Sequence, residues 1–531
     1  MHFARRPRNT RSSAARKWLP ARLRRAAASP NNDPDHLEHP SEDAAALVQQ
    51  EAAEAAEAAQ AAEVAEQAAE DAAQAAARAT ADLHARLDAF SFTEEELQRR
   101  RAIRERLAIQ SGVVLKLGTM LMGAGAGSYR VKTSMARLAT AIGIEKHQSQ
   151  VSLTELTTTA YAAHTFRTEL AEQRAVGVNA DRIDELRRFV RDLRPGLLAE
   201  DAEAELDRIA NKPHLYSRLQ LALASGFGCA GFAFLNKGGW VECSVVLFAA
   251  FIGQYIRSRM LGKRFNHVAT WMVCATVASS LYISAVMALM SAGLVDSTHQ
   301  AGAVSAMLFL VPGFPLVTAI LDLVRLDLIA GLTRGAYVLI LMVSAGVAMW
   351  VVSSLFHWSV TPSAPREIAP SLLIALNALA TFIAAFCFAL LFNSPWKVAL
   401  TAATIGAVLN PVRIFAVSLG APNQAMVGIA CLLVGLVATA ISAKTYFSRV
   451  TLSVPAVVIM IPGVPFYRAI TALNMGQTVD AIASILEISF VILAIGVGLA
   501  ISRMVTDRGW AFDSPTLPTT DLSPEMTTVV R

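Results

Sequence analysis

A hydrophobic segment of the chain is interrupted by two prolines and a glycine, in the stretch Leu310-Val311-Pro312-Gly313-Phe314-Pro315-Leu316-Val317. Proline lacks a backbone N–H and clashes with the preceding helical turn, so a continuous helix is not expected here. Inside a bilayer, the backbone groups that such a break releases must find partners in protein or in a water-filled cavity. We therefore expect the backbone groups that the break releases to have a function.

The same pattern returns 150 residues later, in the stretch Met460-Ile461-Pro462-Gly463-Val464-Pro465-Phe466. Two interrupted hydrophobic segments in corresponding positions indicate the substrate site of a secondary transporter. The N-terminus of a half-helix attracts carboxylates, and freed carbonyls accept hydrogen bonds from ammonium groups. A structural kink packed by its neighbours is the alternative. The residues predicted to line a substrate pathway are Pro312, Gly313, Pro315, Pro462, Gly463 and Pro465.

The composition of the 531-residue chain, 54% hydrophobic and 17% charged, is unevenly distributed. Residues 1 to about 215 are charged and Ala-rich, whereas residues from about 217 to 505 form successive apolar runs. Most runs are near the ~20 residues that a bilayer requires. The five cysteines include no CxxC pair, so neither a disulfide framework nor a metal site is expected. The net charge of +5 mainly reflects membrane topology and does not indicate nucleic-acid binding.

The apolar runs predict ten membrane segments, at 217–235, 239–257, 268–292, 300–321, 328–355, 370–392, 396–420, 423–443, 452–472 and 480–504. Arg and Lys are concentrated in alternate loops, among them Arg257, Arg259, Lys263 and Arg264 after the second segment. This bias predicts that both termini are cytoplasmic.

The two halves of the apolar region correspond, since each holds five segments with the Pro-Gly-x-Pro pattern in the fourth. Asn236 with Trp240 in the first half matches Asn393 with Trp396 in the second. An odd number of spans means that the second copy inserts in the opposite sense. The predicted fold class is therefore a polytopic α-helical membrane protein. Its ten transmembrane helices form two inverted five-helix repeats, at 217–355 and 370–504.

The remainder of the chain is predicted to lie outside the bilayer. Residues 1–42 and 505–531 are expected to be disordered, and the Ala/Glu-rich stretch 43–100 to be a solvated spacer helix. Residues 105–212 are expected to form a small α+β cytoplasmic domain, with strands at 148–153 and 157–166. The Gly-rich stretch 123–130 lacks the Gly-Lys-Ser/Thr ending of a phosphate loop, so close helix packing is favoured there.

Ionisable residues inside apolar segments are costly unless they are paired or functional. Glu487 in the tenth segment is the leading candidate for a proton site, with a structural pair to Arg413 or Arg468 as the alternative. Asp322 ends the fourth segment and Arg334 begins the fifth. A gate or a loop-fixing salt bridge between these two is as well founded as a proton relay.

Two further polar residues lie in or beside the apolar runs. Asn410 precedes Pro411, which is expected to break the seventh segment, so Asn410 could offer hydrogen bonds to a substrate. Glu242 lies near a predicted membrane interface and is expected to be solvated.

Three motifs together resemble the threonine/serine exporter family, over residues 105–505. They are Leu121-Met122-Gly123-Ala124-Gly125-Ala126-Gly127-Ser128-Tyr129-Arg130-Val131, then Pro312-Gly313-Phe314-Pro315-Leu316-Val317 with Asp322, Gly331 and Arg334, and Ile461-Pro462-Gly463-Val464-Pro465-Phe466-Tyr467-Arg468. The resemblance implies a soluble domain followed by ten membrane helices. It also implies export of threonine and serine driven by the proton motive force. Gly127-Ser128 departs from the family, which often has an acidic residue or threonine before the Tyr-Arg pair.

The expected function is therefore proton antiport of threonine and serine by alternating access in the plasma membrane, with no cofactor and no enzymatic activity. The expected partners are the substrate, protons and the lipid bilayer, and the chain could also form a homo-oligomer. The alternatives are export of a dicarboxylate such as succinate, or a membrane-anchored hydrolase or regulatory protein that acts through its soluble domain.

Overall fold

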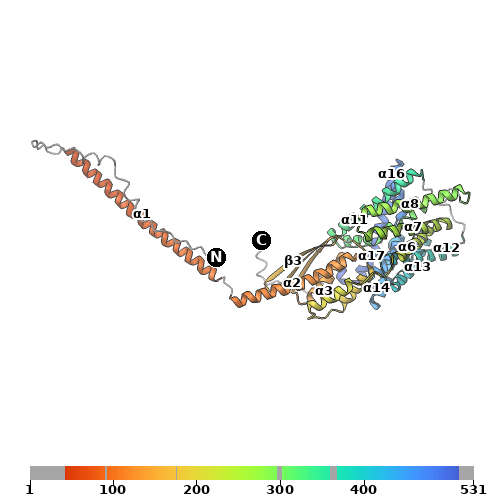
Figure 1. Ribbon diagram of the computed structural model, residues 1–531, viewed down its shortest axis with the longest axis horizontal. Helices are drawn as coiled ribbons and strands as arrows, with labels where there is room; N and C mark the ends of the chain where they lie inside the picture. The colour runs from red at the N-terminus through yellow and green to blue at the C-terminus, as the bar shows by residue number, and fades with distance from the viewer. Residues whose placement is uncertain (1–41, 90–92, 175, 296–301, 359–367, 513–531) are drawn as a thin grey trace, which may run out of the picture. The chain divides into compact units, whose positions relative to one another are not determined.

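The computed structural model describes residues 42–89, 93–174, 176–295, 302–358 and 368–512. The predicted basic arm, apart from its last residue, and the tail beyond residue 512 lie outside these ranges. The chain divides into two compact units, Met1–Glu96 and Leu97–Arg531 (Figure 1).

The first unit contains the helix α1 (Glu42–Ala89), which is 48 residues long. Its side chains are exposed wherever they are described, and its Ala and Glu residues are strong helix formers. Next comes α2 (Glu94–Gly123), which begins with a capping box in which Thr93 and Glu96 bond each other's backbone N–H. Residues 101–104, which separate the predicted spacer helix from the predicted domain, lie within α2, and α2 continues into the second unit.

Residues 97–174 and 176–217 of the second unit pack helices against a small sheet, and we call them the soluble part because their sequence predicts a place outside the bilayer. The antiparallel sheet has the order β1-β2-β3, and a turn at Ala163, with φ of 49°, separates its last two strands. The single strand predicted at 157–166 is therefore two strands. The remaining elements are α3 (Ser128–Ala141), β1 (Lys146–Val151), β2 (Glu155–Ala162), β3 (Thr165–Glu172), α4 (Ala180–Arg191) and α5 (Ala199–Ala210).

The apolar part of the second unit is helical. Among the described residues, eight helices are long and apolar enough to cross a membrane, or nine if one bent pair counts as a span, so this is a multi-pass membrane protein. Its elements are α6 (Arg218–Leu235), α7 (Trp240–Gly262), α8 (His267–Ser291), α9 (Gly302–Ser305), η2 (Leu308–Leu310), α10 (Gly313–Val324), α11 (Leu328–Leu355), α12 (Pro370–Leu391), α13 (Trp396–Ser418), α14 (Asn423–Lys444), α15 (Arg449–Val458), α16 (Gly463–Asn474), α17 (Thr478–Thr506) and α18 (Arg508–Ala511).

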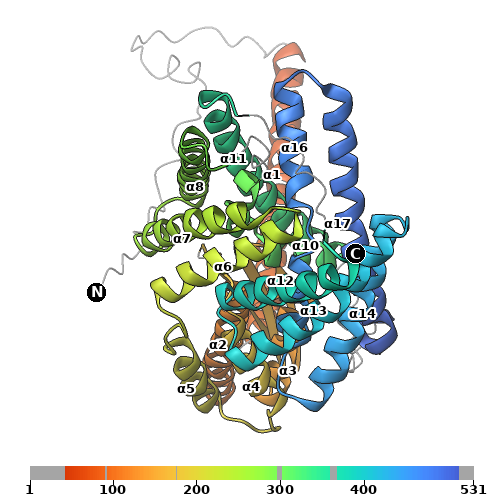
Figure 2. The ribbon, with the colours of Figure 1, turned by 90° about the vertical axis from the view of Figure 1, so that its right-hand side faces the viewer.

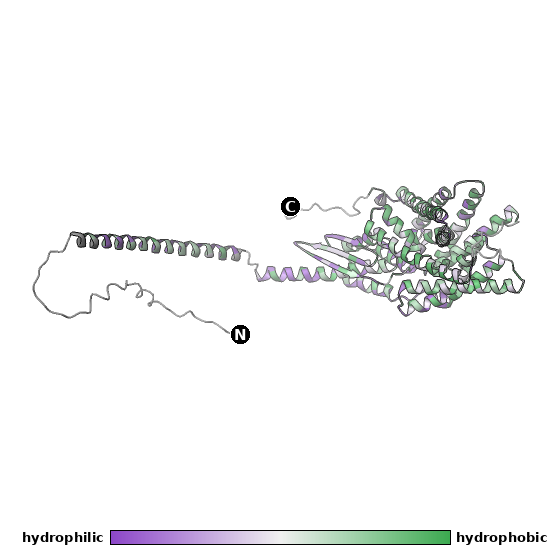
Figure 3. Ribbon diagram, turned by 90° about the horizontal axis from the view of Figure 1, so that it is seen from above, coloured by the Kyte–Doolittle hydropathy of each residue, from purple (hydrophilic) through white to green (hydrophobic). Residues whose placement is uncertain are grey.

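Large apolar side chains cover the outside of these helices. Phe248, Leu339 and Phe490 are 67%, 59% and 58% exposed. Figure 3 shows the hydrophobic colouring of the helices beside the hydrophilic colouring of the strands. Such a surface is stable in contact with lipid tails.

The soluble elements α2 to α5 gather at one end of the second unit (Figure 2). The chain enters α6 there, where Tyr216 donates its hydroxyl to the Ser394 carbonyl at 2.7 Å. Leu215 N–H also donates to Asn393 Oδ1 at 3.0 Å. The start of α6 and the end of α12 therefore lie at the same end of the unit, which is the end that the soluble part covers.

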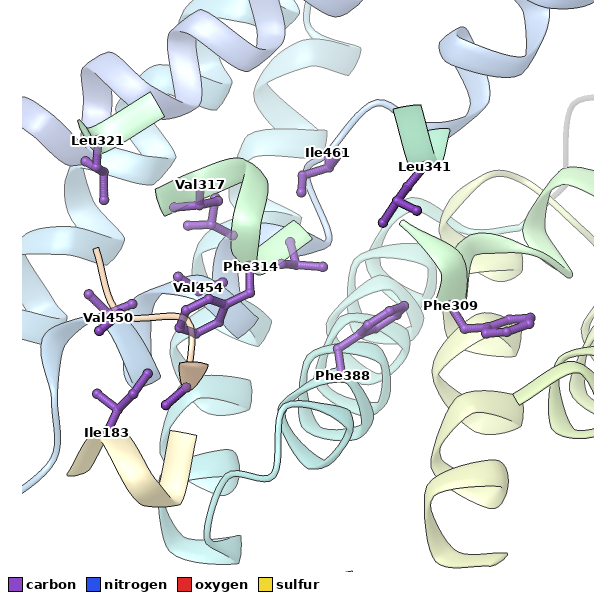
Figure 4. Packing of buried hydrophobic residues seen from close by; sticks show 14 of the residues in the cluster. Ile183, Phe309, Phe314, Val317, Leu321, Leu341, Phe388, Val450, Val454 and Ile461 are labelled. Atoms are coloured by element: carbon purple, nitrogen blue, oxygen red, sulfur yellow. The ribbon is translucent and has the colours of Figure 1, made fainter. Parts of the chain in front are cut away.

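A buried carboxylate joins α4 of the soluble part to α15. Asp184 accepts hydrogen bonds from Ser448 N–H at 3.0 Å and from the Thr451 hydroxyl at 3.1 Å. The adjacent Ile183 packs near Val450 (Figure 4). Burial raises the pKa of Asp184 to about 7, although these two hydrogen bonds and nearby arginines favour the charged form.

The raised pKa predicts a pH-dependent junction. Because the folded pKa of Asp184, about 7, exceeds its unfolded value of 3.8, the folded protein holds an extra proton between these values. The contribution of Asp184 to stability is therefore greatest below pH 3.8 and is lost as the pH rises to about 7. In Asp184→Asn the melting temperature of the purified protein should fall less between pH 5 and pH 8 than in the wild type. Asp192→Asn, at the exposed end of the same helix, should keep the wild-type profile. Identical profiles for Asp184→Asn and the wild type would contradict the assignment.

Candidate functional site

The two Pro-Gly-x-Pro breaks have the same local backbone structure. Each is followed by a 12-residue helix that begins at the glycine, α10 at Gly313 and α16 at Gly463. Gly313 N–H donates to the Val311 carbonyl at 2.8 Å, and Gly463 N–H donates to the Ile461 carbonyl at 2.9 Å. The first break bends the helix path by 67°.

The correspondence extends beyond the two short helices. The turn after α10 contains Leu326 with φ of 65°, and the turn after α16 contains Gly476 with φ of 71°. These residues are 150 positions apart, as are the two break glycines. A long helix follows each turn at once, α11 from Leu328 and α17 from Thr478.

The two breaks also contact each other. A Cβ atom on Gly313 would lie 2.8 Å from Cγ2 of Val458, and one on Gly463 would lie 2.5 Å from Cδ2 of Leu308. Leu308 precedes Pro312 by four residues, and Val458 precedes Pro462 by four. Each glycine is therefore packed against the equivalent residue of the other half.

A cavity of about 790 Å³ lies beside the breaks and is lined by Pro312, Pro462 and residues of α11, α16 and α17. None of the described lining residues carries a charge, and Ser489 has the only hydroxyl among them. Gly463 lines a smaller cavity of about 30 Å³. Of the other predicted pathway residues, Gly313 is buried, and Pro315 and Pro465 are half-buried in the first turns of α10 and α16.

Protein side chains satisfy two of the carbonyls that precede the first break. Arg257 donates to the Phe309 carbonyl at 3.1 Å, and the Trp271 indole donates to the Leu310 carbonyl at 2.7 Å. The Arg257 guanidinium also stacks on the Trp271 ring, 4.5 Å from its centroid. The sequence analysis counted Arg257 only as a loop cation, but it lies within α7. Its place among the basic residues of the loop after the second predicted segment hid this role.

Asn410 is buried between helices and lies outside both cavities. Its amide donates to the Thr381 hydroxyl at 2.9 Å and accepts from Arg413 Nε at 2.9 Å. The expected break at Pro411 was wrong, because α13 continues from Trp396 to Ser418. Proline removes one N–H, and a helix packed by its neighbours can accommodate that loss.

The pair of Asn410 and Arg413 has a counterpart in the first half. Arg257 donates to Gln254 at 3.2 Å with the same three-residue spacing, 156 positions earlier. Each membrane half therefore holds one arginine that an amide side chain orients.

Asp322 and Arg334 are joined to each other and to the Gly-rich motif of the soluble part. Their closest charged atoms are 3.6 Å apart, and the residues are 3% and 2% exposed. Asp322 accepts from Ser128 N–H at 3.0 Å, and Arg334 donates to the Ala126 carbonyl at 2.7 Å. A Cβ on Gly127 would lie 3.2 Å from the Asp322 carboxylate, so glycine permits this close approach.

The remaining ionisable candidates lie near the large cavity without lining it. Glu487 is half-buried on α17, directly before the lining residues Ile488 and Ser489. Arg468 is exposed on α16. The expectation that Glu242 is solvated was wrong, since it is 2% exposed.

Comparison with known proteins places this arrangement in a family. A family model described as "Putative threonine/serine exporter" matches residues 112–356, and a second, "Threonine/Serine exporter, ThrE", matches residues 377–505. The chain belongs to the threonine/serine exporter family, a family of transporters and not of enzymes.

Individual relatives carry two kinds of name. The "Probable threonine/serine exporter" of Mycobacterium tuberculosis is 25% identical over 414 residues, covering 74% of this chain and 75% of that protein. The "Probable succinate transporter subunit YjjP" of Escherichia coli is 29% identical over 268 residues, covering 50% of this chain and 97% of the relative. The protein of the same name in Klebsiella aerogenes is 29% identical over 239 residues, covering 45% of this chain and 90% of that relative. No solved structure matches the chain.

The reciprocal contact of the breaks predicts that both glycines are required. Leucine at Gly313 or Gly463 would overlap Val458 or Leu308 and force the breaks apart. We expect both variants to reach the membrane but to lose at least nine-tenths of threonine efflux, by an order-of-magnitude allowance for such overpacking. Gly112→Leu, where a Cβ meets no atom within 4 Å, is the control. Unchanged efflux in both break variants would refute their place in the pathway.

Proposed function

We propose that this protein is a secondary active exporter of threonine and serine that exchanges them for protons by alternating access. The observation that carries this proposal is the reciprocal packing of the two breaks beside one cavity. Moving parts that meet at broken helices are typical of secondary transporters. Membership of the exporter family supports the same reading.

The proposed membrane architecture has ten spans in two inverted five-helix repeats. This number is reached when α9, η2 and α10 count as one span and α15 and α16 as another. The matching geometry of the breaks supports the repeat. The inversion is supported by α6 and α12, the first helices of the two halves, because the start of α6 and the end of α12 lie at the same end of the unit. A later span that ends where its counterpart begins runs in the opposite direction.

The proposed substrate pathway runs between the halves, past Pro312, Gly313 and Pro315 and their counterparts Pro462, Gly463 and Pro465. A volume of about 790 Å³ accommodates a small amino acid, and the N-termini of α10 and α16 favour its carboxylate. The apolar walls contribute no charge of their own. Asn410 is given a supporting role, because Thr381 and Arg413 occupy its amide.

We assign proton coupling to Asp322 ahead of Glu487. Asp322 is deeply buried and joins the soluble part to the fourth span, so a change in its charge alters contacts on both sides. Arg334 is its gate partner. Glu487 and Arg468 are the second choice, since they lie beside the large cavity.

We place the protein in the plasma membrane with both termini in the cytoplasm. The soluble part covers the end of the unit where α7 has Arg259 in its last turn and is followed by Lys263 and Arg264. Arg503 and Arg508 lie at the same end, near Asp507 and Trp510. A cluster of cations at one end of the spans is typical of the cytoplasmic side.

Export of a dicarboxylate is the second candidate. The relatives named as succinate transporter subunits favour it, and Arg257 and Arg413 add half-buried cations to the membrane part.

The two substrates can be separated in proteoliposomes. Purified full-length protein should drive uptake of labelled threonine and serine when a pH gradient of the correct sign is imposed, and a protonophore should abolish the gradient-dependent part. Uptake of succinate without uptake of threonine would select the dicarboxylate reading. Protein-free vesicles are the control, and absence of flux for all three compounds would refute transport of either class.

A further inference from the structure

A second, much smaller cavity lies where the soluble part meets the membrane helices. Its volume is about 20 Å³, enough for about one water molecule. The soluble part contributes Gly127, Tyr129 and Arg130, and the membrane part contributes Thr318 and Asp322 of α10, with the remaining walls from Leu321, Val450, Arg503 and Trp510. The cavity therefore joins two of the three family motifs.

Two arginines from distant parts of the chain line this cavity. Arg130 comes from α3 and Arg503 from the last turn of α17. Within the described ranges, neither guanidinium makes a hydrogen bond or ion pair with another residue. Burial, followed by the like charge of Arg503, lowers the pKa of Arg130 to about 9, so its positive charge is retained at neutral pH but at a cost. A bound anion would remove that cost.

Asp322 provides the opposite charge in the same cavity. Its Oδ1 accepts from Ser128 N–H, but its buried Oδ2 receives no hydrogen bond from the described residues and is only 3.6 Å from Arg334. The cavity thus combines two half-buried arginines, which make no side-chain hydrogen bond or salt bridge with the described residues, and one carboxylate oxygen that accepts no hydrogen bond from them. These charges are complementary to the carboxylate and the ammonium group of an amino-acid zwitterion.

We propose that Arg130 and Arg503 bind the carboxylate of the exported substrate at this junction, and that Asp322 binds its ammonium group when the substrate is an amino acid. Arginine suits this task because its planar fork matches a carboxylate with two parallel hydrogen bonds. This inference rests on the proposed function and adds a binding site to it on the side of the soluble part.

The size of the cavity indicates that the structure shows this site closed. A threonine molecule needs several times the volume of one water, so the soluble part must withdraw from α10 and α17 to admit it. The contacts to be released include those of Ser128 with Asp322 and of Ala126 with Arg334, together with the ion pair of Lys132 and Asp327. A substrate ammonium and a proton would then compete for Asp322, which links the site to antiport.

The test is equilibrium binding of labelled L-threonine and labelled succinate to the purified full-length protein. Arg130→Gln and Arg503→Gln should each raise the Kd of the transported ligand about tenfold to a hundredfold, the range for a lost charge-assisted hydrogen bond. Arg130→Lys and Arg503→Lys should have Kd values between those of the wild type and the Gln variants, because lysine keeps the charge but lacks the planar fork of arginine. The control is Arg191→Gln, which removes an arginine of the soluble part that stacks on Tyr446 and does not line the cavity, and this variant should bind as the wild type does.

A second arm separates the two ligand classes. Asp322→Asn should weaken binding of threonine at least about tenfold more than it weakens binding of succinate, since only threonine has an ammonium group. Equal weakening of both ligands would overturn the role given to Asp322.

Other outcomes overturn the site as a whole. Wild-type Kd values in all four arginine variants would refute the proposed binding site without refuting threonine export. If sodium chloride displaced the labelled ligands as effectively as unlabelled ligand does, the site would bind anions without selectivity. That result would refute a substrate site. If the wild-type protein neither binds nor transports threonine, serine or succinate, the proposed function falls and this inference falls with it.

Discussion

The structure depends on the contact between two broken helices, in which each break glycine packs against a side chain of the opposite half. A proline break in a membrane is costly because it releases backbone groups that lipid cannot satisfy. The protein offsets this cost locally, since Arg257 and Trp271 bond the carbonyls before the first break. The breaks are thereby stable enough to persist, and the glycines keep them close enough to form one shared element.

The soluble part is bound to both halves of the membrane part and therefore constrains their relative motion. Ser128 bonds Asp322 of the first half, and Asp184 bonds Ser448 of the second. Figure 4 shows how Ile183, Val450 and Phe314 continue this junction with apolar contacts. A motion that separates the halves at this end must break buried polar contacts, each of which is expensive to leave unpaired. Substrate or proton binding at the junction is one way to compensate for them.

The breaks could be predicted because proline and glycine act locally, and the apolar segments because membrane thickness fixes their length. Contacts between distant residues could not be predicted this way. The sequence predicts that Arg257 is a loop cation, yet Arg257 donates a hydrogen bond to a backbone carbonyl of the first break. Pro411 predicts a break in the helix, yet α13 continues through this residue. The pairing of Arg130 with Arg503 across one cavity has no signal in a single sequence, because it depends on tertiary packing.

If the protein exports its substrate by alternating access, the two breaks move relative to each other during transport. The most direct measurement is transport by Gly313→Cys/Val458→Cys, made in a background whose five native cysteines are replaced by alanine. The contact at this pair is close enough for a disulfide, since a Cβ on Gly313 lies 2.8 Å from a γ-carbon of Val458. Val458→Cys leaves one γ-atom in place of the two γ-carbons that a Cβ on Gly313 would meet, so the reduced double variant has room that Gly313→Leu lacks. We predict threonine transport in the reduced protein, loss of it on oxidation, and recovery with reductant. Equal transport in the reduced protein and in protein shown by mass spectrometry to be cross-linked would contradict the account.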